Sequence, residues 1–534
     1  MVLPKGSDFT FELSLSIDRV VTGASYSNYT LTERLAEPNR YQTITFHHVE
    51  YSTLIHLDIS QAIKITCRGN QTSQSEYVAK THLRVNTPID ETPFAKEGYA
   101  LVGWQNDGET IGLGSRVNAN KDIVLDAVYL PEEAEANLAI EILDDRRVAI
   151  QGYSGNGDTL VLPRQIQGRN VVSIGKGAFK GLILKTLVLP RTLSQIEAGA
   201  FEDCHIQELV LFENLVNVSD ACFVDTSIQK LRINATKGPA YIRTYFGTYA
   251  EKMDRLIALE KKKKILLYSG SSTRFGFDSE AIDKTFLGYD VVNMGVFAYT
   301  ASYPQVDLLS HYLQAEDVVV VSPEFDAIEE QIHLEPIFDW ATFALCEANY
   351  DLLSLLDISQ YDRVFDAFGE YQHRRNNLPR YAYSDSPYQY DEDGGYHKTP
   401  TYNAYGDYSL YRENNASRKP FGVKRAYYNK THFPQEYLDQ FDDCFDLVRG
   451  KGAALYYDYS PRMDISISED STPASIAELG SYLEESIAME FLSSIEESLM
   501  DPLYFHGTDN HLSSEGVSIR TKRVIQALGD RLER

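Results

Sequence analysis

The chain has 534 residues, of which 43% are hydrophobic and 24% are charged, a composition ordinary for globular protein. At roughly 150 residues per domain, this length predicts three or four domains rather than a single core. The 77 acidic and 50 basic residues give a formal net charge of −27, which repels a phosphate backbone and excludes nucleic acid as an expected partner.

Five cysteines stand at scattered positions, and none belongs to a CxxC pair or another metal-ligand spacing. We therefore expect neither a disulfide framework nor a metal site, and no cofactor is indicated. No window reaches the roughly 18 apolar residues of a membrane span, and Met1 to Ser7 lack the apolar core of a signal peptide. Either the protein is cytosolic or its export signal is missing from this sequence, and the domain content described next favours the second.

Residues 1–88 carry strand patterns and are expected to form a small β domain. Phe9 to Leu15 alternates apolar and polar residues with a period of two, Ile55 to Ile59 repeats this alternation, and Ala62 to Cys67 is a further short strand. These patterns indicate no particular role for the domain.

Residues 89–130 contain two strand patterns separated by a turn-rich stretch. The first holds the motifs EGY and GW between Phe94 and Trp104, and the second runs from Asp122 to Tyr129. These motifs resemble the small bacterial surface repeat of internalin type. Trp104 is the only large anchor of so small a core, which favours core packing over the alternative of a sugar-stacking ring.

Residues 131–238 contain an internal repeat. A step of 22 residues separates Phe179, Phe201 and Phe223, and small residues (Ala178, Ala200 and Cys222) precede them. The same step relates three further apolar sets, namely Ile174, Ile196 and Val218; Leu187, Leu209 and Leu231; and Leu189, Leu211 and Ile233. This period, with one L-x-L strand per repeat, is typical of a leucine-rich solenoid, whose units stack because none can bury its apolar face alone.

The wording of the repeat, IGKGAFKG at residues 174–181, resembles the BspA-like class of leucine-rich repeat. The resemblance implies an extracellular or cell-surface protein of bacteria whose front domains contact a cell wall or a host surface. We expect so short an array to act as a spacer more than as a ligand-binding surface. Cys204 and Cys222 are expected in its core.

Residues 239–534 alternate apolar strands with helical stretches, which predicts an α/β fold. Ile265 to Tyr268, Tyr289 to Gly295 and Asp317 to Glu324 contain short apolar runs of parallel-strand type, and Ala453 to Tyr457 is a later strand. In a doubly wound sheet, ligands bind at the carboxyl ends of the strands near the point where the strand order reverses.

Short polar motifs follow these strands. They read G-S-S at residues 270–272, N-x-G at 293–295 and N-H-L at 510–512. Together they resemble the SGNH (GDSL-type) hydrolase superfamily over residues 262–534, in particular its bacterial branch with G-S-S in the first block. The resemblance implies a flavodoxin-like parallel sheet.

The same resemblance implies catalysis through an acyl-enzyme. Ser272 matches the nucleophile and His511 its general base, which is needed because a serine hydroxyl is a weak nucleophile at its free pKa. The backbone amides of Ser272 and Gly295 match the oxyanion donors. Ser271 is expected to be a helix-capping neighbour.

Two positions depart from the family pattern. The third block of the family supplies an asparagine where this chain has Glu324, whose carboxylate opposes a developing negative charge unless it is protonated or turned away. The family's acid falls on Thr508, so Asp509 takes that role or the acid is absent. Asn293, Arg274 and Glu324 are weaker candidates for substrate contact.

A tyrosine-rich insertion at residues 336–450 separates the third and fourth strands. It either packs over the sheet through its amphipathic rings or forms a lid or glycan-binding wall, and the sequence favours neither.

Two functions remain open. The first is an extracellular serine esterase or O-acyltransferase that acts on acetyl or similar esters of a surface or dietary polysaccharide. The alternative is a cell-surface adhesion or glycan-binding protein whose hydrolase domain has lost activity. A contact between Ser272 and His511, with a carboxylate behind the imidazole, favours the first.

Overall fold

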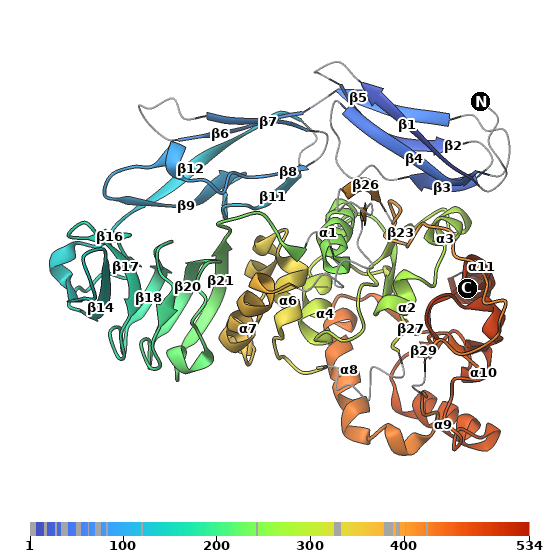
Figure 1. Ribbon diagram of the computed structural model, residues 1–534. Helices are drawn as coiled ribbons and strands as arrows, with labels where there is room; N and C mark the ends of the chain where they lie inside the picture. The colour runs from blue at the N-terminus through green and yellow to red at the C-terminus, as the bar shows by residue number, and fades with distance from the viewer. Residues whose placement is uncertain are drawn as a thin grey trace. The chain divides into compact units, whose positions relative to one another are not determined.

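The computed structural model divides the chain into two compact units, which are described separately. The α/β unit comprises Met1–Ser60, Arg243–Glu335 and Tyr383–Arg534, and the repeat unit comprises Gln61–Ile242 and Pro336–Ala382 (Figure 1). The structure describes residues 7–532 except 15–18, 27–28, 34–40, 50–54, 62, 70–75, 82–83, 119–120, 242–243, 325–332, 379–387, 391–395, 401 and 423–424.

The expected β domain of residues 1–88 is divided between the two units. Strands β1 (Ser7–Ser14) and β4 (Tyr41–Val49) form an antiparallel pair, while β2 (Arg19–Tyr26), β3 (Tyr29–Glu33) and β5 (Ile55–Gln61) form a three-stranded sheet. In contrast, β6 (Ile63–Arg68), β7 (Glu76–Thr81) and β8 (Arg84–Asn86) join the repeat unit, because β6 pairs in parallel with β12 and β8 pairs with β11. The expected boundary at residue 88 therefore lies too late in the chain.

Trp104 belongs to strand β9 of a five-stranded sheet of order β10-β9-β12-β6-β7. Its further strands are β9 (Tyr99–Asn106), β10 (Glu109–Ile111) and β12 (Ile123–Pro131), and β11 (Arg116–Asn118) and the 3-10 turn η1 (Thr92–Phe94) lie beside it. Trp104 is 0% exposed and meets Phe94 edge to face at 4.8 Å. The core interpretation of Trp104 is confirmed, since a fully buried ring cannot stack on a sugar.

The repeat region forms a short solenoid. Its main parallel sheet consists of β15 (Thr159–Val161), β18 (Ile183–Val188), β20 (His205–Phe212) and β21 (Ser227–Asn234). Shorter strands complete the turns: β13 (Leu138–Ile142), β14 (Arg147–Tyr153), β16 (Gln165–Ile166), β17 (Arg169–Ile174) and β19 (Gln195–Ile196), with 3-10 turns η2 (Glu135–Asn137) and η3 (Asp220–Phe223).

The phenylalanines that recur every 22 residues stack on one another and form a ladder of rings along the solenoid. The rings of Phe179 and Phe201 lie 5.2 Å apart, as do those of Phe201 and Phe223, and both pairs are nearly parallel. Cys204 and Cys222 are buried beside them, which confirms their expected place in the core. The predicted solenoid is therefore present, and its repeats stack through the residues that define the period.

One face of the solenoid sheet is covered by the sheet around Trp104. Val161, Val188 and Val210 of successive solenoid strands pack against Val102 and other side chains of β9 and β12. This face therefore packs inside the repeat unit, and the spacer role of the array stays a prediction.

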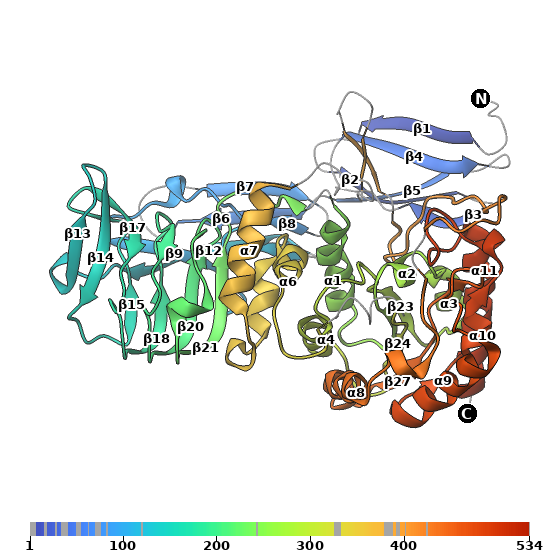
Figure 2. The ribbon, with the colours of Figure 1, turned by 60° about the horizontal axis from the view of Figure 1, so that its bottom comes forward.

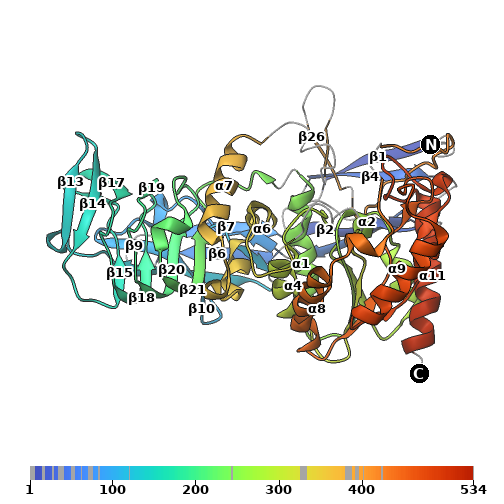
Figure 3. The same ribbon diagram turned by 90° about the horizontal axis from the view of Figure 1, so that it is seen from below.

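The first part of the tyrosine-rich insertion caps the solenoid instead of covering the α/β sheet. Phe365 stacks on Phe223 at 4.1 Å and so extends the phenylalanine ladder beyond the last repeat. The last strand, β21, lies beside the capping segment, which carries α6 (Trp340–Cys346), η6 (Tyr350–Leu355), η7 (Ile358–Gln360) and α7 (Val364–Asn376) (Figure 3). The expectation that 336–450 belongs as a whole to the hydrolase-like domain is therefore corrected, because the open end of a solenoid needs an apolar cover.

The α/β unit is built on a parallel sheet of order β23-β22-β24-β27-β29. The strands are β22 (Lys264–Tyr268), β23 (Asp290–Asn293), β24 (Val318–Val321), β27 (Ala454–Tyr457) and β29 (Glu490–Phe491). In chain order this is 2-1-3-4-5, the flavodoxin-like arrangement, and its strand order reverses between β22 and β24. The predicted parallel α/β sheet is confirmed.

Helices cover both faces of this sheet (Figure 2). Ile265 and Val320 belong to the same core cluster as Val524 of α11 (Ser514–Leu532), whereas Tyr268 meets Phe445 of α8 (Gln435–Arg449) on the other face. The remaining elements of the unit are η5 (Tyr245–Thr248), α1 (Tyr249–Ala258), α2 (Ser271–Arg274), α3 (Ser279–Thr285), α4 (Ser302–Ser310), β25 (Tyr388–Tyr390), β26 (Tyr396–Pro400), η9 (Lys430–His432), β28 (Arg462–Met463), α9 (Pro473–Ser486), α10 (Ile495–Ser498), β30 (Leu499–Met500) and η10 (Pro502–Tyr504). Within the described residues, no helix combines the length and the apolar character needed to cross a bilayer.

Candidate active site

The candidate site lies where the strand order reverses. Strands β22 and β24 are hydrogen-bonded neighbours that end at Tyr268 and Val321, and these two residues are paired in the register. The G-S-S turn follows the first strand, and Glu324 follows the second, so both arrive at the same edge of the sheet. This is the position at which open α/β sheets bind ligands.

His511 contacts Ser271 and not Ser272. The Nε2 atom of His511 lies 2.8 Å from the Ser271 hydroxyl. Ser272 is 0% exposed, and its hydroxyl lies 3.1 Å from that of Ser460, which in turn donates to the Ser322 carbonyl. The structure therefore does not bring Ser272 and His511 together as expected, because consecutive side chains at the start of a helix diverge by about 100° and only one can face the histidine.

The surroundings of His511 keep its ring neutral. Burial lowers the pKa of His511 to about 3, and the positive charges of Arg412 and Arg274 lower it further. The ring stacks on Phe275 with centroids 4.2 Å apart. A neutral imidazole that carries its proton on Nδ1 accepts at Nε2, so it can accept the proton of the Ser271 hydroxyl.

Asp509 does not orient His511 as expected. Its carboxylate accepts hydrogen bonds from the Phe421 amide at 2.6 Å and from the Ser466 hydroxyl at 2.8 Å. Among the residues that the structure describes, no carboxylate lies within ion-pair distance of the His511 ring. The site is thus a serine–histidine pair without the expected acid behind the ring.

Gly295 does not present its amide to the site. Its N–H donates to the Asn293 side chain at 2.9 Å, and its carbonyl accepts from the Lys252 Nζ atom at 2.5 Å. A side chain at this position would collide with the Arg274 backbone nitrogen, so glycine is required for close packing. The Gly295 amide is thus hydrogen-bonded to Asn293, as the Ser272 amide is to Glu324, and its expected oxyanion role stays a prediction.

Asn293 and Arg274, the expected substrate contacts, are both internal. The Asn293 amide donates to the Asp407 carboxylate at 2.8 Å and to the Thr273 carbonyl at 3.0 Å, and its side chain is 0% exposed. Arg274 is 1% exposed and lies over the rings of Phe275 and Tyr408. Neither side chain reaches a substrate directly, although the charge of Arg274 acts on His511.

Glu324 is turned toward the two serines. One carboxylate oxygen accepts from the Ser272 amide at 2.7 Å and from the Ser271 hydroxyl at 3.3 Å, while the other accepts from the Asn510 side chain at 2.7 Å. Glu324 is 3% exposed. The residue that departs from the family pattern therefore occupies the centre of the site.

A buried ion pair fixes the serine turn from behind. Arg520 of α11 and Asp458, which follows β27, lie 2.7 Å apart and are both 0% exposed. Burial disfavours the Asp458 carboxylate, but the charges of Arg520 and Arg523 outweigh it and hold its pKa below the usual value. Arg520 also donates to the Ser272 carbonyl at 3.1 Å, which ties α2 to the last helix.

Sequence reasoning missed three residues of the site. Asn510 stands inside the quoted N-H-L motif but was given no role, and Ser460 and Arg412 follow no recognisable pattern. Arg412 is 6% exposed, donates to the Phe275 carbonyl at 2.8 Å, and lies over the rings of Phe275 and Tyr408. Burial lowers the pKa of Arg412 to about 10, so it remains a cation near His511 at neutral pH.

The tyrosines after residue 400 pack into the α/β unit. The Tyr402 hydroxyl donates to Glu251 at 2.5 Å, that of Tyr405 donates to Asp283 at 3.2 Å, and the Tyr408 ring lies 4.7 Å from Phe275. Tyr411 is 47% exposed. Tyr381 and Tyr383 lie outside the described residues, as do the side chains of Tyr388, Tyr390 and Tyr396.

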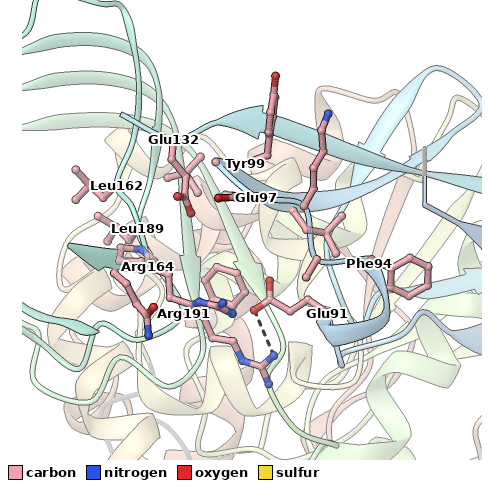
Figure 4. A pocket seen from close by; sticks show the side chains of 18 residues that line it. Glu91, Phe94, Glu97, Tyr99, Glu132, Leu162, Arg164, Leu189 and Arg191 are labelled. Carbon is pink, nitrogen blue, oxygen red and sulfur yellow. Dashed lines mark hydrogen bonds and ion pairs between the residues drawn. The ribbon is translucent and has the colours of Figure 1, made fainter. Parts of the chain in front are cut away.

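Two cavities accompany these features. A small one of about 30 Å³ in the α/β unit borders Gly270 and Glu324. A larger one of about 260 Å³ lies in the repeat unit, with buried Leu162 and Leu189 among its lining residues (Figure 4). The Glu91–Arg191 ion pair, with N···O at 3.3 Å, closes one side of it. Within the described part of the chain, no group of three or more metal-ligating side chains is present.

Comparison with known proteins identifies the repeat region. Residues 165–258 match the family model of the BspA type leucine rich repeat region in six copies. A solved structure similar to the chain is that of the T. pallidum leucine rich repeat protein (TpLRR), with 18% identity, 20% of this chain and 64% of that chain covered, and a TM-score of 0.12. The chain thus spans less than two thirds of that protein. No curated protein matches the chain. The BspA-type repeat region, expected from the resemblance of residues 174–181, is confirmed.

Proposed function

We propose that this chain is an extracellular or cell-surface serine hydrolase of SGNH type, with Ser271 as nucleophile and His511 as general base. The observation that carries the proposal is the 2.8 Å contact between the His511 Nε2 atom and the Ser271 hydroxyl at the point where the sheet order reverses. The proposed substrates are acetyl or similar esters of a surface or dietary polysaccharide, with water or another sugar hydroxyl as the acyl acceptor.

The proposed reaction has two halves. The Ser271 oxygen attacks the acyl carbonyl while its proton passes to His511, and the alcohol leaves with that proton to give an acyl-serine. Water or a sugar hydroxyl then releases the acyl group by the reverse proton path. Because the pKa of His511 is lowered to about 3, the imidazole is a weak base, so activated esters should react much faster than alkyl esters.

Two similarities support the rest of the proposal. The BspA-type repeat region favours a location on the cell surface, and the internalin-type motif around Trp104 points the same way. The motifs G-S-S, N-x-G and N-H-L support the SGNH relation. The front domains would hold the hydrolase at a cell wall or a host surface.

The first experiment compares the two serines. Ser271→Ala should abolish hydrolysis of p-nitrophenyl acetate and labelling by a fluorophosphonate probe. Ser272→Ala is the matched control, because its hydroxyl contacts Ser460 and its backbone amide is kept; it should retain at least about a tenth of the wild-type rate. Turnover that survives Ser271→Ala in folded protein would rule out the proposed mechanism.

A second candidate function is adhesion or glycan binding without catalysis. It is favoured by the occupied amides of Ser272 and Gly295 and by the cavity of about 260 Å³ in the repeat unit, which combines an apolar floor with charged walls. Binding of polysaccharide that is lost in Arg191→Ala and unchanged in Ser271→Ala, together with no esterase activity, would establish this function over the first.

A further inference from the structure

Two amide donors from distant parts of the chain converge beside Ser271. The Ser272 backbone amide donates to one oxygen of the Glu324 carboxylate, and the Asn510 side chain donates to the other, each at 2.7 Å. Carboxylate hydrogen bonds of this length are strong, and two donors aimed at neighbouring oxygens define a small anion site. The site lies next to the proposed nucleophile.

The carboxylate also contacts the proposed nucleophile. The Glu324 oxygen that accepts from the Ser272 amide accepts from the Ser271 hydroxyl at 3.3 Å as well. A substrate oxygen that replaced this carboxylate oxygen at the Ser272 amide would therefore lie beside Ser271.

Hydrogen bonding fixes the orientation of the Asn510 amide. The Thr508 hydroxyl accepts from the His511 backbone N–H at 3.0 Å, so its single proton is free to go to the Asn510 carbonyl oxygen at 2.8 Å. The amide nitrogen of Asn510 must then face Glu324. Thr508 stands where the family has its acid, and here it orients an amide donor.

The other expected donor is not available. The Gly295 amide is hydrogen-bonded to Asn293, whose own amide is held by Asp407 and by the Thr273 carbonyl. The Ser272 amide and Asn510 are thus two donors that bind the two oxygens of one carboxylate beside the proposed nucleophile.

We infer that the Ser272 amide and the Asn510 side chain form the oxyanion site of this protein, and that Glu324 occupies that site and must leave it before Ser271 is acylated. The inference rests on the proposed hydrolase function. It assigns Asn510 the role that the third family block gives to asparagine, and it makes Glu324 an internal competitor of the substrate.

A fluorophosphonate probe tests the inference because its phosphoryl oxygen needs the same site. In the labelling step the bond from the Ser271 oxygen to phosphorus forms, the phosphorus–fluorine bond breaks, fluoride leaves, and the serine proton passes to His511. The phosphoryl oxygen is then held by the two amides. The rate of labelling therefore reports whether the donors are accessible.

The experiment uses the full chain with four substitutions, singly and combined: Glu324→Ala, Glu324→Gln, Asn510→Ala and Ser271→Ala. Glu324→Ala should raise the labelling rate at least about tenfold, and Glu324→Gln should raise it too, because it removes the charge and disrupts one acceptor contact. In the Glu324→Ala background, Asn510→Ala should lower labelling by about 10²–10³-fold, the usual loss for one oxyanion donor.

Matched controls come from the same unit. Glu316→Ala removes an exposed carboxylate that pairs with Lys263, and Asn414→Ala removes an amide that donates to Glu515. Both should leave labelling unchanged. Thermal unfolding of each variant shows that it is folded, and Glu324→Gln, which preserves shape, replaces Glu324→Ala if that variant unfolds.

The outcomes separate the inference from the function on which it rests. If Ser271 is labelled but both folded Glu324 variants react more slowly, Glu324 is a positioning residue and the inference is overturned. If Asn510→Ala has no effect in the Glu324→Ala background, the oxyanion assignment is overturned. If no variant is labelled at Ser271, the proposed function fails, and the inference fails with it.

Discussion

At the scale of single residues, the site depends on which of two adjacent serines faces the histidine. The side chains of Ser271 and Ser272 leave the first turn of α2 in different directions, one toward His511 and the other toward Ser460. The middle residue of the G-S-S motif is therefore the serine that contacts His511.

The low pKa of His511 predicts an unusual pH profile. As the proposed base, His511 must be neutral, and its pKa of about 3 keeps it neutral at every pH above about 4. Fluorophosphonate labelling of Ser271 should therefore be independent of His511 protonation between pH 5 and 8, a range in which an ordinary histidine with a pKa of about 6.5 loses its proton. A labelling profile with a midpoint near 6.5 would contradict this prediction.

The charge of Arg412 is predicted to contribute to the lowered pKa of His511. Its positive charge is, after burial, the largest cause of the lowered His511 pKa. Arg412→Met removes the charge and keeps much of the volume, so the His511 pKa should rise, as measured by NMR titration of the ring. Arg418→Met, which removes an exposed arginine paired with Asp501, is the control and should leave that pKa unchanged.

The sequence predicted part of this site for definite reasons. His511 was identified because its motif is local in the chain, and the edge of the sheet followed from the order of strands and motifs. The choice of Ser271 over Ser272 depends on the direction of side chains in one helical turn, which no residue pattern specifies. Asn510, Ser460 and Arg412 reach the site only through long-range folding.

At the scale of elements, the phenylalanine ladder shows how a repeat is closed. The 22-residue period predicted the stacking of Phe179, Phe201 and Phe223, since equivalent residues of neighbouring units must meet. It could not predict Phe365, because the capping segment does not carry the repeat. The fourth ring was found only in the structure.

Truncation of that fourth ring should destabilise the repeat unit. Phe365 is 5% exposed and covers Phe223, so Phe365→Ala leaves a cavity at the end of the solenoid. We expect a loss of about 3 kcal/mol in the free energy of unfolding of the repeat unit, measured by urea denaturation. Phe421→Ala, at a ring that is 45% exposed, should change that free energy by less than about 1 kcal/mol.

At the scale of the whole molecule, the two units are interleaved in the sequence. The α/β unit takes three segments of the chain and the repeat unit takes two. The compact units do not follow one another along the chain as expected. The order of motifs along a chain cannot show that a later segment returns to an earlier unit.

This interleaving predicts that the front of the chain is not self-sufficient. A fragment of residues 61–242 lacks the capping helices, so its last repeat should expose an apolar end and the fragment should aggregate or unfold with low cooperativity. The same fragment joined through a flexible linker to residues 336–382 should unfold cooperatively at a higher temperature. Equal melting curves for the two proteins would show that the segment is not a structural cap.

The capping segment also limits how the two units can be exchanged between genes. Its two ends both continue into the α/β unit, so no single cut in the polypeptide releases either unit intact. A gene exchanged at one breakpoint would deliver a solenoid without its end cover or a sheet missing one of its segments. A single exchange of this kind therefore cannot join either complete unit to a new partner domain.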